Sequence, residues 1–315
     1  MGEEIEGVEM KKKVLLTGAS GGIGCSVPKV LCERGFEVYA PIRQEVQAEG
    51  EVHWIRGNIL DDAFIDRMMA EIKPEYLIHL AWDRSSIYEK HAPLQYAFLS
   101  SGIRLAQAFA ENGGKRALYI GSFSEYATSD RPLKETDAVD LSRTHYAFCK
   151  HHLHEIAERY FRANGVSFGY ARIAGSYSLE DTHKNRLMGS LWKAFLNDQT
   201  FVFKDRSLSR DFIYVKDVAA ALVQFLESGV EGTVNICTGK ATSVKDFVTL
   251  FAKKVRKEHL LIFKDDCADQ VPVQFGDNTR LVKEVGYTPR YTVEQGLSEI
   301  AEEFLKAEKE RKTKN

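Results

Sequence analysis

The chain has 315 residues, 44% of them hydrophobic and 28% charged, a composition typical of a globular protein with a substantial core. Its formal net charge of −2 argues against a surface for nucleic acids or anionic membranes. No apolar run approaches the roughly 18 residues of a membrane span, and the acidic first ten residues lack the apolar region of a signal peptide.

The cysteines are scattered along the chain and form no C-x-x-C pair. They stand at positions 25, 32, 149, 237 and 267. An odd number at irregular spacing predicts free thiols in a reducing compartment, not a disulfide framework or a zinc site. We therefore expect a cytoplasmic protein without a metal site.

The first predicted element is a short buried strand at Val14–Leu16, which runs into a glycine-rich turn and then a helix. Glycines stand at positions 18, 21, 22 and 24. Glycine can take the positive φ of a tight turn, and a backbone without Cβ can lie against a pyrophosphate. The helix that follows offers unpaired N–H groups to the same anion. This context predicts a dinucleotide-binding turn.

Short apolar runs alternate with helical patterns from residue 14 to about residue 172. The runs are Val14–Leu16, Val38–Ala40, Val52–Ile55, Tyr76–Ala81, Ala117–Ile120 and Phe168–Ile173. The helical patterns are Cys25–Glu33, Asp62–Ile72, Leu94–Asn112 and Thr144–Asn164. This alternation predicts an α/β protein of the Rossmann type, with a doubly wound parallel sheet.

The C-terminal part is more mixed. Its predicted elements are helices at Arg186–Asn197, Asp217–Glu227, Val244–Arg256 and Val293–Lys306, and strands at Asp211–Val215 and Gly232–Cys237. We expect a dinucleotide-binding domain at 11–175, to which 205–240 returns. A smaller, discontinuous α/β substrate domain is expected at 176–204 and 241–305. The charged, polar ends at 1–10 and 306–315 are expected to be flexible tails.

Four polar residues in this framework are candidates for a reactive site: a Tyr-Lys pair for proton transfer, and two serines for hydrogen bonds to a substrate oxygen. Tyr146 and Lys150 stand four apart on a predicted helix, so the phenol and the ammonium share one face. A phenol has a reference pKa of about 10, and a nearby cation lowers it toward the range of a usable acid or base. Ser122 and Ser124 follow a predicted strand whose carboxyl end points toward the ligand crevice of such folds.

Together these residues resemble the extended short-chain dehydrogenase/reductase family, whose members are mostly nucleotide-sugar epimerases, dehydratases and 4-ketoreductases. The motifs are T-G-x-x-G-x-x-G at Thr17–Gly24, H-L-A at His79–Ala81, Ser122 four residues before Tyr126, Y-x-x-x-K at Tyr146–Lys150, and R-D-F-I-Y-V-x-D-V at Arg210–Val218. The resemblance runs from about residue 12 to residue 305. The last motif marks the sugar-nucleotide branch.

The resemblance implies a role for each of these positions. Tyr146 is the general acid/base, Lys150 lowers its pKa and holds the nicotinamide ribose, and Ser122 orients the substrate carbonyl. The implied cofactor-binding residues are Gly18, Ser20, Gly21, Gly22, Ile23, Gly24, Arg43, Asn58, Ile59, Leu80, Ala81, Trp82, Tyr146 and Lys150. Asn58 stands where the family usually has an Asp beside the adenine, and an amide can both donate and accept there.

The form of the cofactor is predicted from the end of the second strand. Members of the family that use NAD usually carry an Asp there, which binds the ribose 2′-hydroxyl. Here that place is occupied by Ile42, and Arg43 follows. A missing carboxylate beside a guanidinium favours the 2′-phosphate of NADP(H), with NAD(H) as the alternative.

The positions after Ser122 bear on the reaction. Dehydratases of the family carry an Asp-Glu pair there, and members that epimerise C3 and C5 carry a cysteine, whereas this chain has Phe123 and Ser124. Since Phe123 cannot transfer a proton, hydride transfer at C4 without elimination or enolisation is expected. The expected enzyme is an NADPH-dependent reductase of a nucleotide-linked 4-keto-6-deoxy sugar. The alternatives are a nucleotide-sugar 4-epimerase that retains NAD, and a non-catalytic dinucleotide-binding regulator.

The expected substrate is a nucleotide-diphosphate sugar, although two positions that often grip one differ here. Leu99 and Gly175 stand where the family often has asparagine. Arg186 or Lys184 could replace that grip, and Arg210 is expected to meet the diphosphate. The implied substrate-binding residues are Trp82, Ser122, Phe123, Ser124, Arg186 and Arg210.

Two further features concern metals and partners. Histidines at 145, 151, 152 and 154 crowd the Tyr-Lys helix, and a solvated helix face is expected there instead of a metal site. In the family, the helix at Leu94–Asn112 and the Tyr-Lys helix pair with their copies in a four-helix interface. The resemblance therefore implies a homodimer.

Overall fold

The computed structural model describes residues 11–44, 51–87, 89, 91–180, 186–205, 208–265 and 273–314. The predicted N-terminal tail, residues 1–10, lies outside this part of the chain, as does Lys184.

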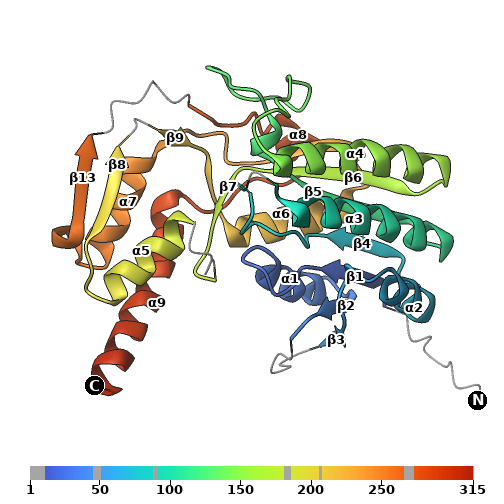
Figure 1. The fold of residues 1–315 in the computed structure, drawn as a ribbon, viewed down its shortest axis with the longest axis horizontal. Coiled ribbons are helices and arrows are strands. Elements are labelled where there is room, and N and C mark those ends of the chain that lie inside the picture. Colours follow the sequence, from blue (N-terminus) through green and yellow to red (C-terminus); the bar gives the residue numbers. More distant parts are fainter. Residues whose placement is uncertain are drawn as a thin grey trace, which may run out of the picture.

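A seven-stranded sheet, parallel throughout, forms the larger part of the molecule (Figure 1). Its strands are β1 (Lys13–Thr17), β2 (Glu37–Ile42), β3 (Val52–Arg56), β4 (Tyr76–His79), β5 (Arg116–Ser122), β6 (Ser167–Ile173) and β11 (Gly232–Ile236). The order across the sheet is β11-β6-β5-β4-β1-β2-β3. The chain therefore reverses direction across the sheet between β1 and β4, which is where ligands bind in such folds.

Helices cover both faces of this sheet. They are α1 (Val27–Glu33) and α6 (Val215–Ser228) on one face, and α2 (Asp62–Ile72), α3 (Pro93–Glu111) and α4 (His145–Ala163) on the other. Alternate residues of β1 enter different cores: Val14 and Leu16 pack with α1 and α6, and Leu15 packs with the other three helices. The strand is thus buried on both sides, which explains its uninterrupted apolar sequence.

A smaller unit lies at the left of Figure 1. It holds α5 (Leu187–Leu196), α7 (Val244–Lys254), α9 (Val293–Lys314) and the parallel pair β8 (Phe201–Asp205) and β13 (Leu261–Asp265). Short elements connect it to the sheet: β7 (Gly175–Tyr177) pairs with β10 (Phe212–Tyr214), and β9 (Ser209–Arg210) with β12 (Thr242–Ser243). The remaining helices are α8 (Thr279–Lys283) and the 3₁₀ turns η1 (Gly24–Ser26), η2 (Phe123–Glu125) and η3 (Glu258–Leu260).

The smaller unit has an aromatic core of its own, which includes the fully buried Phe195, Phe247, Phe251 and Phe304. Segment 205–240 contributes to both parts, because α6 and β11 pack in the core of the large sheet and β9 and β10 lead into the smaller unit. The division into domains at the predicted residues stays a prediction.

One structural expectation differs from the structure at the C-terminus. Residues from Lys306 onward were expected to form a flexible tail, but α9 continues to Lys314. The segment is rich in Lys, Glu, Arg and Ala, which favour helix. Lys257 also holds it, since its Nζ lies 2.7 Å from Glu308 Oε1. A charged composition therefore did not imply disorder here.

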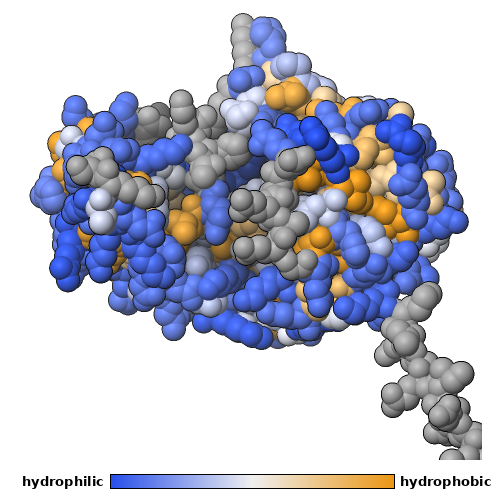
Figure 2. Space-filling view, turned by 90° about the horizontal axis from the view of Figure 1, so that it is seen from below, coloured by the Kyte–Doolittle hydropathy of each residue, from blue (hydrophilic) through white to orange (hydrophobic). Residues whose placement is uncertain are grey.

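Seen from below, hydrophobic side chains gather over the right-hand half of the molecule, the half that carries the sheet (Figure 2). The exposed large hydrophobic side chains of α3 and α4 are Leu94, Tyr96, Phe148 and Ile156. No helix in the described part of the chain is long and apolar enough to cross a membrane.

Candidate active site

The glycine turn after β1 is so tight that two positions exclude any side chain. Gly18 has a φ of +77°, and a Cβ there would lie 2.6 Å from the nitrogen of Ala81. A Cβ at Gly24 would lie 1.9 Å from the carbonyl oxygen of Gly18. The turn closes through the N–H of Gly21, which donates to Gly18 O at 3.0 Å. These residues are glycine because the main chain of two neighbouring loops passes through the space of a side chain.

A groove runs from this turn along the carboxyl ends of the strands. It consists of two cavities that share Gly18, Gly21, Leu80, Trp82 and Arg84 as lining residues. Every residue predicted to bind the cofactor lines it: Gly18, Ser20, Gly21, Gly22, Ile23, Gly24, Arg43, Asn58, Ile59, Leu80, Ala81, Trp82, Tyr146 and Lys150. The bare glycine turn, the elongated shape and a guanidinium at the end of β2 fit a dinucleotide phosphate chain.

Ser122, Tyr146 and Lys150 line the same cavity at the other end of the groove. Ser122 ends β5, and α4 begins at His145 because the side chain of Thr144 accepts a hydrogen bond from the N–H of Ala147. This cap places Tyr146 in the first turn of α4 and Lys150 one turn further on. Residues far apart in sequence thus converge on one space.

Lys150 is held in a buried, partly aromatic environment. Its Nζ donates to the carbonyl of Ile120 at 2.6 Å and lies 4.0 Å from the centroid of the Trp82 ring. The indole also meets the Tyr146 ring edge to face, with 6.3 Å between centroids. Burial lowers the pKa of Lys150 to about 7, and the carboxylate of Glu125 opposes this shift.

Trp82 is fixed by a residue that sequence reasoning did not find. Its Nε1 donates to Oε1 of Gln95 at 2.6 Å, and Gln95 Nε2 donates to Ser86 Oγ at 2.9 Å and to the carbonyl of Asp83 at 3.1 Å. Gln95 is fully buried in the first turn of α3. Its signal in the sequence was a polar amide between apolar helix positions, which alone is too common to indicate a site.

His79 fastens β4 to β1 beneath the groove. Its Nδ1 lies 2.8 Å from Oγ1 of Thr17, which also accepts from the N–H of Ala81 at 3.2 Å. Burial, and to a lesser extent the charge of Lys150, lower the pKa of His79 to about 3. The imidazole is therefore neutral at ordinary pH and links the strands on either side of the topological switch point.

Two guanidinium groups line the cavity that holds Tyr146. Arg186, which was predicted, caps α5 and donates to the carbonyl of Ser176 at 2.7 Å. Arg84, which sequence reasoning missed, lines both cavities, and its Nε is buried without a hydrogen-bond partner. Its sequence signal is its place two residues after Trp82, in the loop that follows the central strand β4.

Three predicted substrate-binding residues are not among the residues that line this cavity. The Phe123 ring is 4% exposed and packs with Tyr126, Leu133 and Cys237. Ser124 donates to Ser122 Oγ at 2.9 Å, and Arg210 donates to the carbonyl of Ser209 at 2.8 Å. Substrate contacts from these three side chains stay predictions that the geometry does not support.

The aspartate next to Arg210 has a structural place. Asp211 is almost fully buried and accepts from the N–H and Oγ1 of Thr238 at 2.9 and 2.6 Å, and from the N–H of Gly239 at 2.9 Å. It thereby fastens the start of β10 to the loop after β11. The sequence motif at Arg210–Val218 thus includes a residue that holds the sheet and the smaller unit together.

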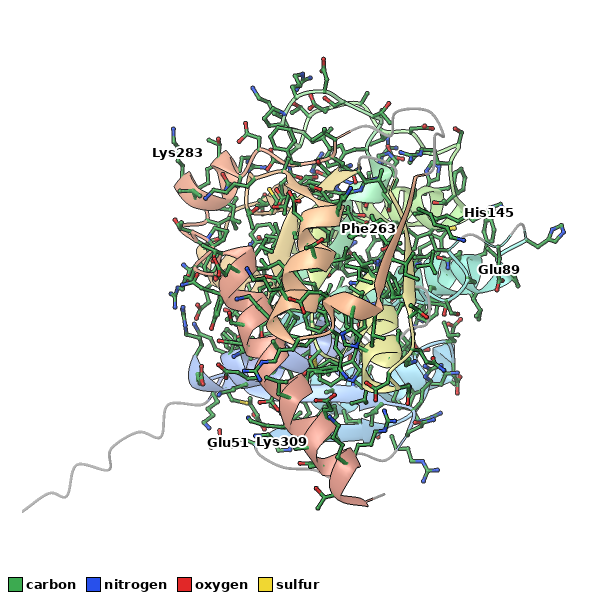
Figure 3. All side chains as sticks on the ribbon, turned by 90° about the vertical axis from the view of Figure 1, so that its left-hand side faces the viewer. Glu51, Glu89, His145, Phe263, Lys283 and Lys309 are labelled. Carbon is green, nitrogen blue, oxygen red and sulfur yellow. The ribbon has the colours of Figure 1, made fainter. Side chains whose placement is uncertain are left out.

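The histidines of α4 do not gather into a metal site, and no group of three or more potential ligands occurs in the described part of the chain. His154 stacks on the Tyr170 ring with 4.0 Å between centroids. His145 bonds to Tyr96 OH at 2.8 Å, on the side of the molecule that also carries Glu89 (Figure 3). His152 pairs with Glu155 at 3.3 Å. Their roles are packing and surface pairing.

The fold and the groove together define a dinucleotide-binding α/β protein with a Ser-Tyr-Lys site. The profile of the NAD dependent epimerase/dehydratase family matches residues 14–237, and the chain belongs to this family. The predicted fold class and the predicted family resemblance are both confirmed.

Similar proteins match over nearly the whole chain. GDP-L-fucose synthase 1 of Arabidopsis thaliana is 24% identical, with 97% of each chain covered. UDP-glucose 4-epimerase of Corynebacterium glutamicum is 26% identical, covering 94% of this chain and 96% of its own length. The crystal structure of UDP-glucose 4-epimerase with UDP-glucose from Thermotoga maritima superposes with a TM-score of 0.85 at 22% identity, covering 93% of this chain and 99% of its own.

Proposed function

We propose that the protein is an NADPH-dependent reductase that transfers hydride to C4 of a nucleotide-linked 4-keto-6-deoxy sugar. The observation that carries the proposal is that Ser122, Tyr146 and Lys150 line one cavity, continuous with the groove over the glycine turn. Membership of the family and the similarity to a GDP-L-fucose synthase support an enzyme that modifies nucleotide sugars.

The cofactor is held along the groove by the residues of the glycine turn, by Asn58 and by Arg43. Asn58 lines the groove, where its Oδ1 accepts from the N–H of Leu60 at 3.1 Å and its amide nitrogen is a donor. Arg43 is exposed at the end of β2 and follows the buried Ile42, so a cation stands where a 2′-phosphate would lie. When bound, the nicotinamide supplies the hydride.

Side chains of the protein bind and protonate the oxygen of the carbonyl group that is reduced. Ser122 Oγ donates a hydrogen bond to this oxygen, and Tyr146 OH gives it the proton that balances the hydride. The ammonium of Lys150 stabilises the phenolate that remains. The environment of Lys150 is buried and partly aromatic, which makes its electrostatic effect stronger than in water.

Elimination and enolisation are disfavoured at this site. The position after Ser122 is a phenylalanine whose ring is buried in the protein interior, and Ser124 Oγ is engaged by Ser122. No acid-base pair of the dehydratase type stands there. Hydride transfer at C4 is the chemistry that needs no further acid or base, and the cation at Arg43 favours reduction by NADPH over epimerisation with a retained NAD.

The substrate's diphosphate is bound by Arg186, with Arg84 as a second cation on the same cavity. The exposed hydrophobic side chains of α3 and α4 make these helices the surface for a homodimer. We place the protein in the cytoplasm because the cysteines in the described part of the chain, at 25, 32, 149 and 237, are free thiols; Cys267 lies outside that part.

A second candidate is a nucleotide-sugar 4-epimerase that retains NAD. It is favoured by the similarity to UDP-glucose 4-epimerases in both sequence and structure. The two enzymes differ in how they use the cofactor, since a reductase consumes free NADPH and an epimerase regenerates the NAD that it keeps bound.

The test follows NADPH oxidation by absorbance on a panel of 4-keto-6-deoxy nucleotide sugars. We expect turnover that is lost by about 10²- to 10⁴-fold in Tyr146→Phe. Interconversion of UDP-sugars without NADPH consumption would establish the epimerase instead. Cofactor binding without turnover of any sugar would leave a non-catalytic regulator.

A further inference from the structure

Beneath the active site lies a carboxylate that the proposed reaction does not use. Glu125, in the turn η2, is fully buried, three residues after Ser122. Its Oε1 accepts from the N–H of Ser122 at 2.7 Å and from Tyr170 OH at 2.9 Å. Its Oε2 accepts from Nε of Arg172 at 3.2 Å. A buried charge with this many donors is held in one place.

The surrounding chain is built to admit this carboxylate. A Cβ at Gly121 would lie 2.6 Å from Glu125 Oε1, so a side chain there would displace it. Tyr170 OH also lies 3.1 Å from the carbonyl oxygen of Lys150, so its one proton is shared between this oxygen and Glu125. The Arg172 guanidinium lies 4.6 Å from the Tyr126 ring centroid. Glu125 therefore joins the end of β5, strand β6 and helix α4 at a single point.

We propose that Glu125 is a positioning residue of the active site: its carboxylate fixes the main chain at Ser122 and, one tyrosine hydroxyl away from the main chain of Lys150, is the counter-charge of the Lys150 ammonium. The proposal rests on the proposed function only in taking Ser122 and Lys150 as the working groups. Glu125 itself does not line the cavity.

The charges around Lys150 show why a counter-charge matters. Arg84, from the loop after β4, and burial both disfavour the ammonium, and neutral His79 lies below it. Tyr146 lies on the same helix, and Arg172 of β6 is engaged by Glu125. His151 Nδ1 lies 3.8 Å from Glu125 Oε2, so this ring is a neighbour of the carboxylate. Of the groups named in this paragraph, Glu125 is the one that carries a negative charge and can stabilise the ammonium.

The ionised state of Glu125 is itself secured. Burial raises the pKa of this carboxyl, but His151, Arg172 and the N–H of Ser122 more than offset burial, so its pKa lies below the ordinary value. The negative charge of Glu125 is therefore present at any pH where Lys150 titrates. Over that range Glu125 stays ionised, and only Lys150 changes its protonation state.

The test measures the Lys150 ammonium directly, by NMR titration of the protein with ¹⁵N-labelled lysine, with Lys150→Met to assign the signal. In Glu125→Gln we expect the titration midpoint to fall by about one pH unit, because the amide keeps the shape but removes the charge. The matched control is Glu135→Gln, because Glu135 is a half-buried carboxylate that accepts from the N–H of Asn235 at 2.9 Å. In this variant the titration midpoint of Lys150 should equal that of the wild type. An unchanged midpoint in Glu125→Gln would overturn the electrostatic role.

Two further variants keep the proposal open to refutation. Should Glu125→Gln fail to fold because Arg172 is left unpaired, the double variant with Arg172→Gln removes both charges. Its midpoint should still fall, but by less than in Glu125→Gln, because the loss of the Arg172 cation partly offsets the loss of the carboxylate. Glu125→Asp keeps the charge on a shorter side chain, so we expect the wild-type midpoint with a reduced kcat. A wild-type kcat in that variant would overturn the positioning of Ser122. The titration needs no substrate, so it reads correctly even if the proposed reductase activity is absent.

Discussion

The part of the groove predicted to hold the cofactor and the part predicted to hold the substrate are called here the cofactor half and the substrate half. They differ in how well the sequence predicts which residues line them. In the cofactor half, every predicted residue lines the groove. In the substrate half, Trp82, Ser122 and Arg186 line the cavity, whereas Phe123, Ser124 and Arg210 do not. The cofactor half is shaped by main chain at the ends of sheet strands, where the fold fixes each position. The substrate half depends on side chains from connecting segments, whose directions local sequence does not determine.

The largest expected effect is at the glycine turn. Gly24→Ala would place a Cβ 1.9 Å from a backbone oxygen, so we expect loss of cofactor binding or of the folded state. Gly35→Ala is the matched control, because Gly35 has a φ of +80° but open space around it. We expect this control to cost only about 1–2 kcal/mol of folding stability and to bind cofactor normally. Thermal unfolding and cofactor titration measure both; equal behaviour of the two variants would contradict the tight-turn account.

The next effect concerns the choice of cofactor at the far end of the same half. Arg43→Ala should lower kcat/KM for NADPH by about 10- to 100-fold, the worth of a lost charge-assisted hydrogen bond, and leave the value for NADH nearly unchanged. Steady-state kinetics with the two cofactors measure this ratio. An equal loss with both would show that Arg43 does not contact the 2′-phosphate.

A smaller effect sharpens the contrast within the substrate half. Arg186 lines the cavity with Tyr146, while Arg210 lies in β9 with its guanidinium bonded to Ser209 O. Arg186→Ala should raise the KM for the nucleotide sugar by about tenfold, and Arg210→Ala should change it much less. Substrate saturation curves for both variants decide this. The reverse order would restore Arg210 as the diphosphate ligand and place Arg186 in a structural role.

The sheet, the glycine turn and the Ser-Tyr-Lys group could be predicted because each depends on a short local pattern. Apolar runs alternating with helical patterns specify a parallel sheet, and the sheet then brings Ser122 to Tyr146 without further information. Gln95, Arg84 and Glu125 could not be found this way. Their importance lies in contacts between segments 13 to 47 residues apart, such as Gln95 with Trp82 and Glu125 with Arg172, and each alone is an ordinary polar residue.

The C-terminal helix shows the same limit from the other side. The charged segment after Lys306 looks like a tail when read alone, yet Lys257 pairs with both Asp198 and Glu308, which holds the C-terminal end of α9 against the rest of the smaller unit. Composition indicates how polar a segment is, but it does not show which distant side chains the segment contacts, such as Lys257 here.

The smallest expected effect tests that tie and the independence of the two units. The bond from Lys257 lowers the pKa of Glu308 below its ordinary value of 4.5. Its stabilising contribution is therefore complete above that value and is lost as the pH falls through the lowered pKa. Glu308→Gln should cost about 0.5–1 kcal/mol at neutral pH, and nothing at acid pH where the wild-type carboxyl is also neutral. Thermal unfolding across this range measures the difference, with Glu310→Gln on the same helix as control.

Cofactor affinity should not change in Glu308→Gln, because α9 packs in the core of the smaller unit and the dinucleotide groove is built on the sheet. A change in affinity would mean that the two units do not act separately.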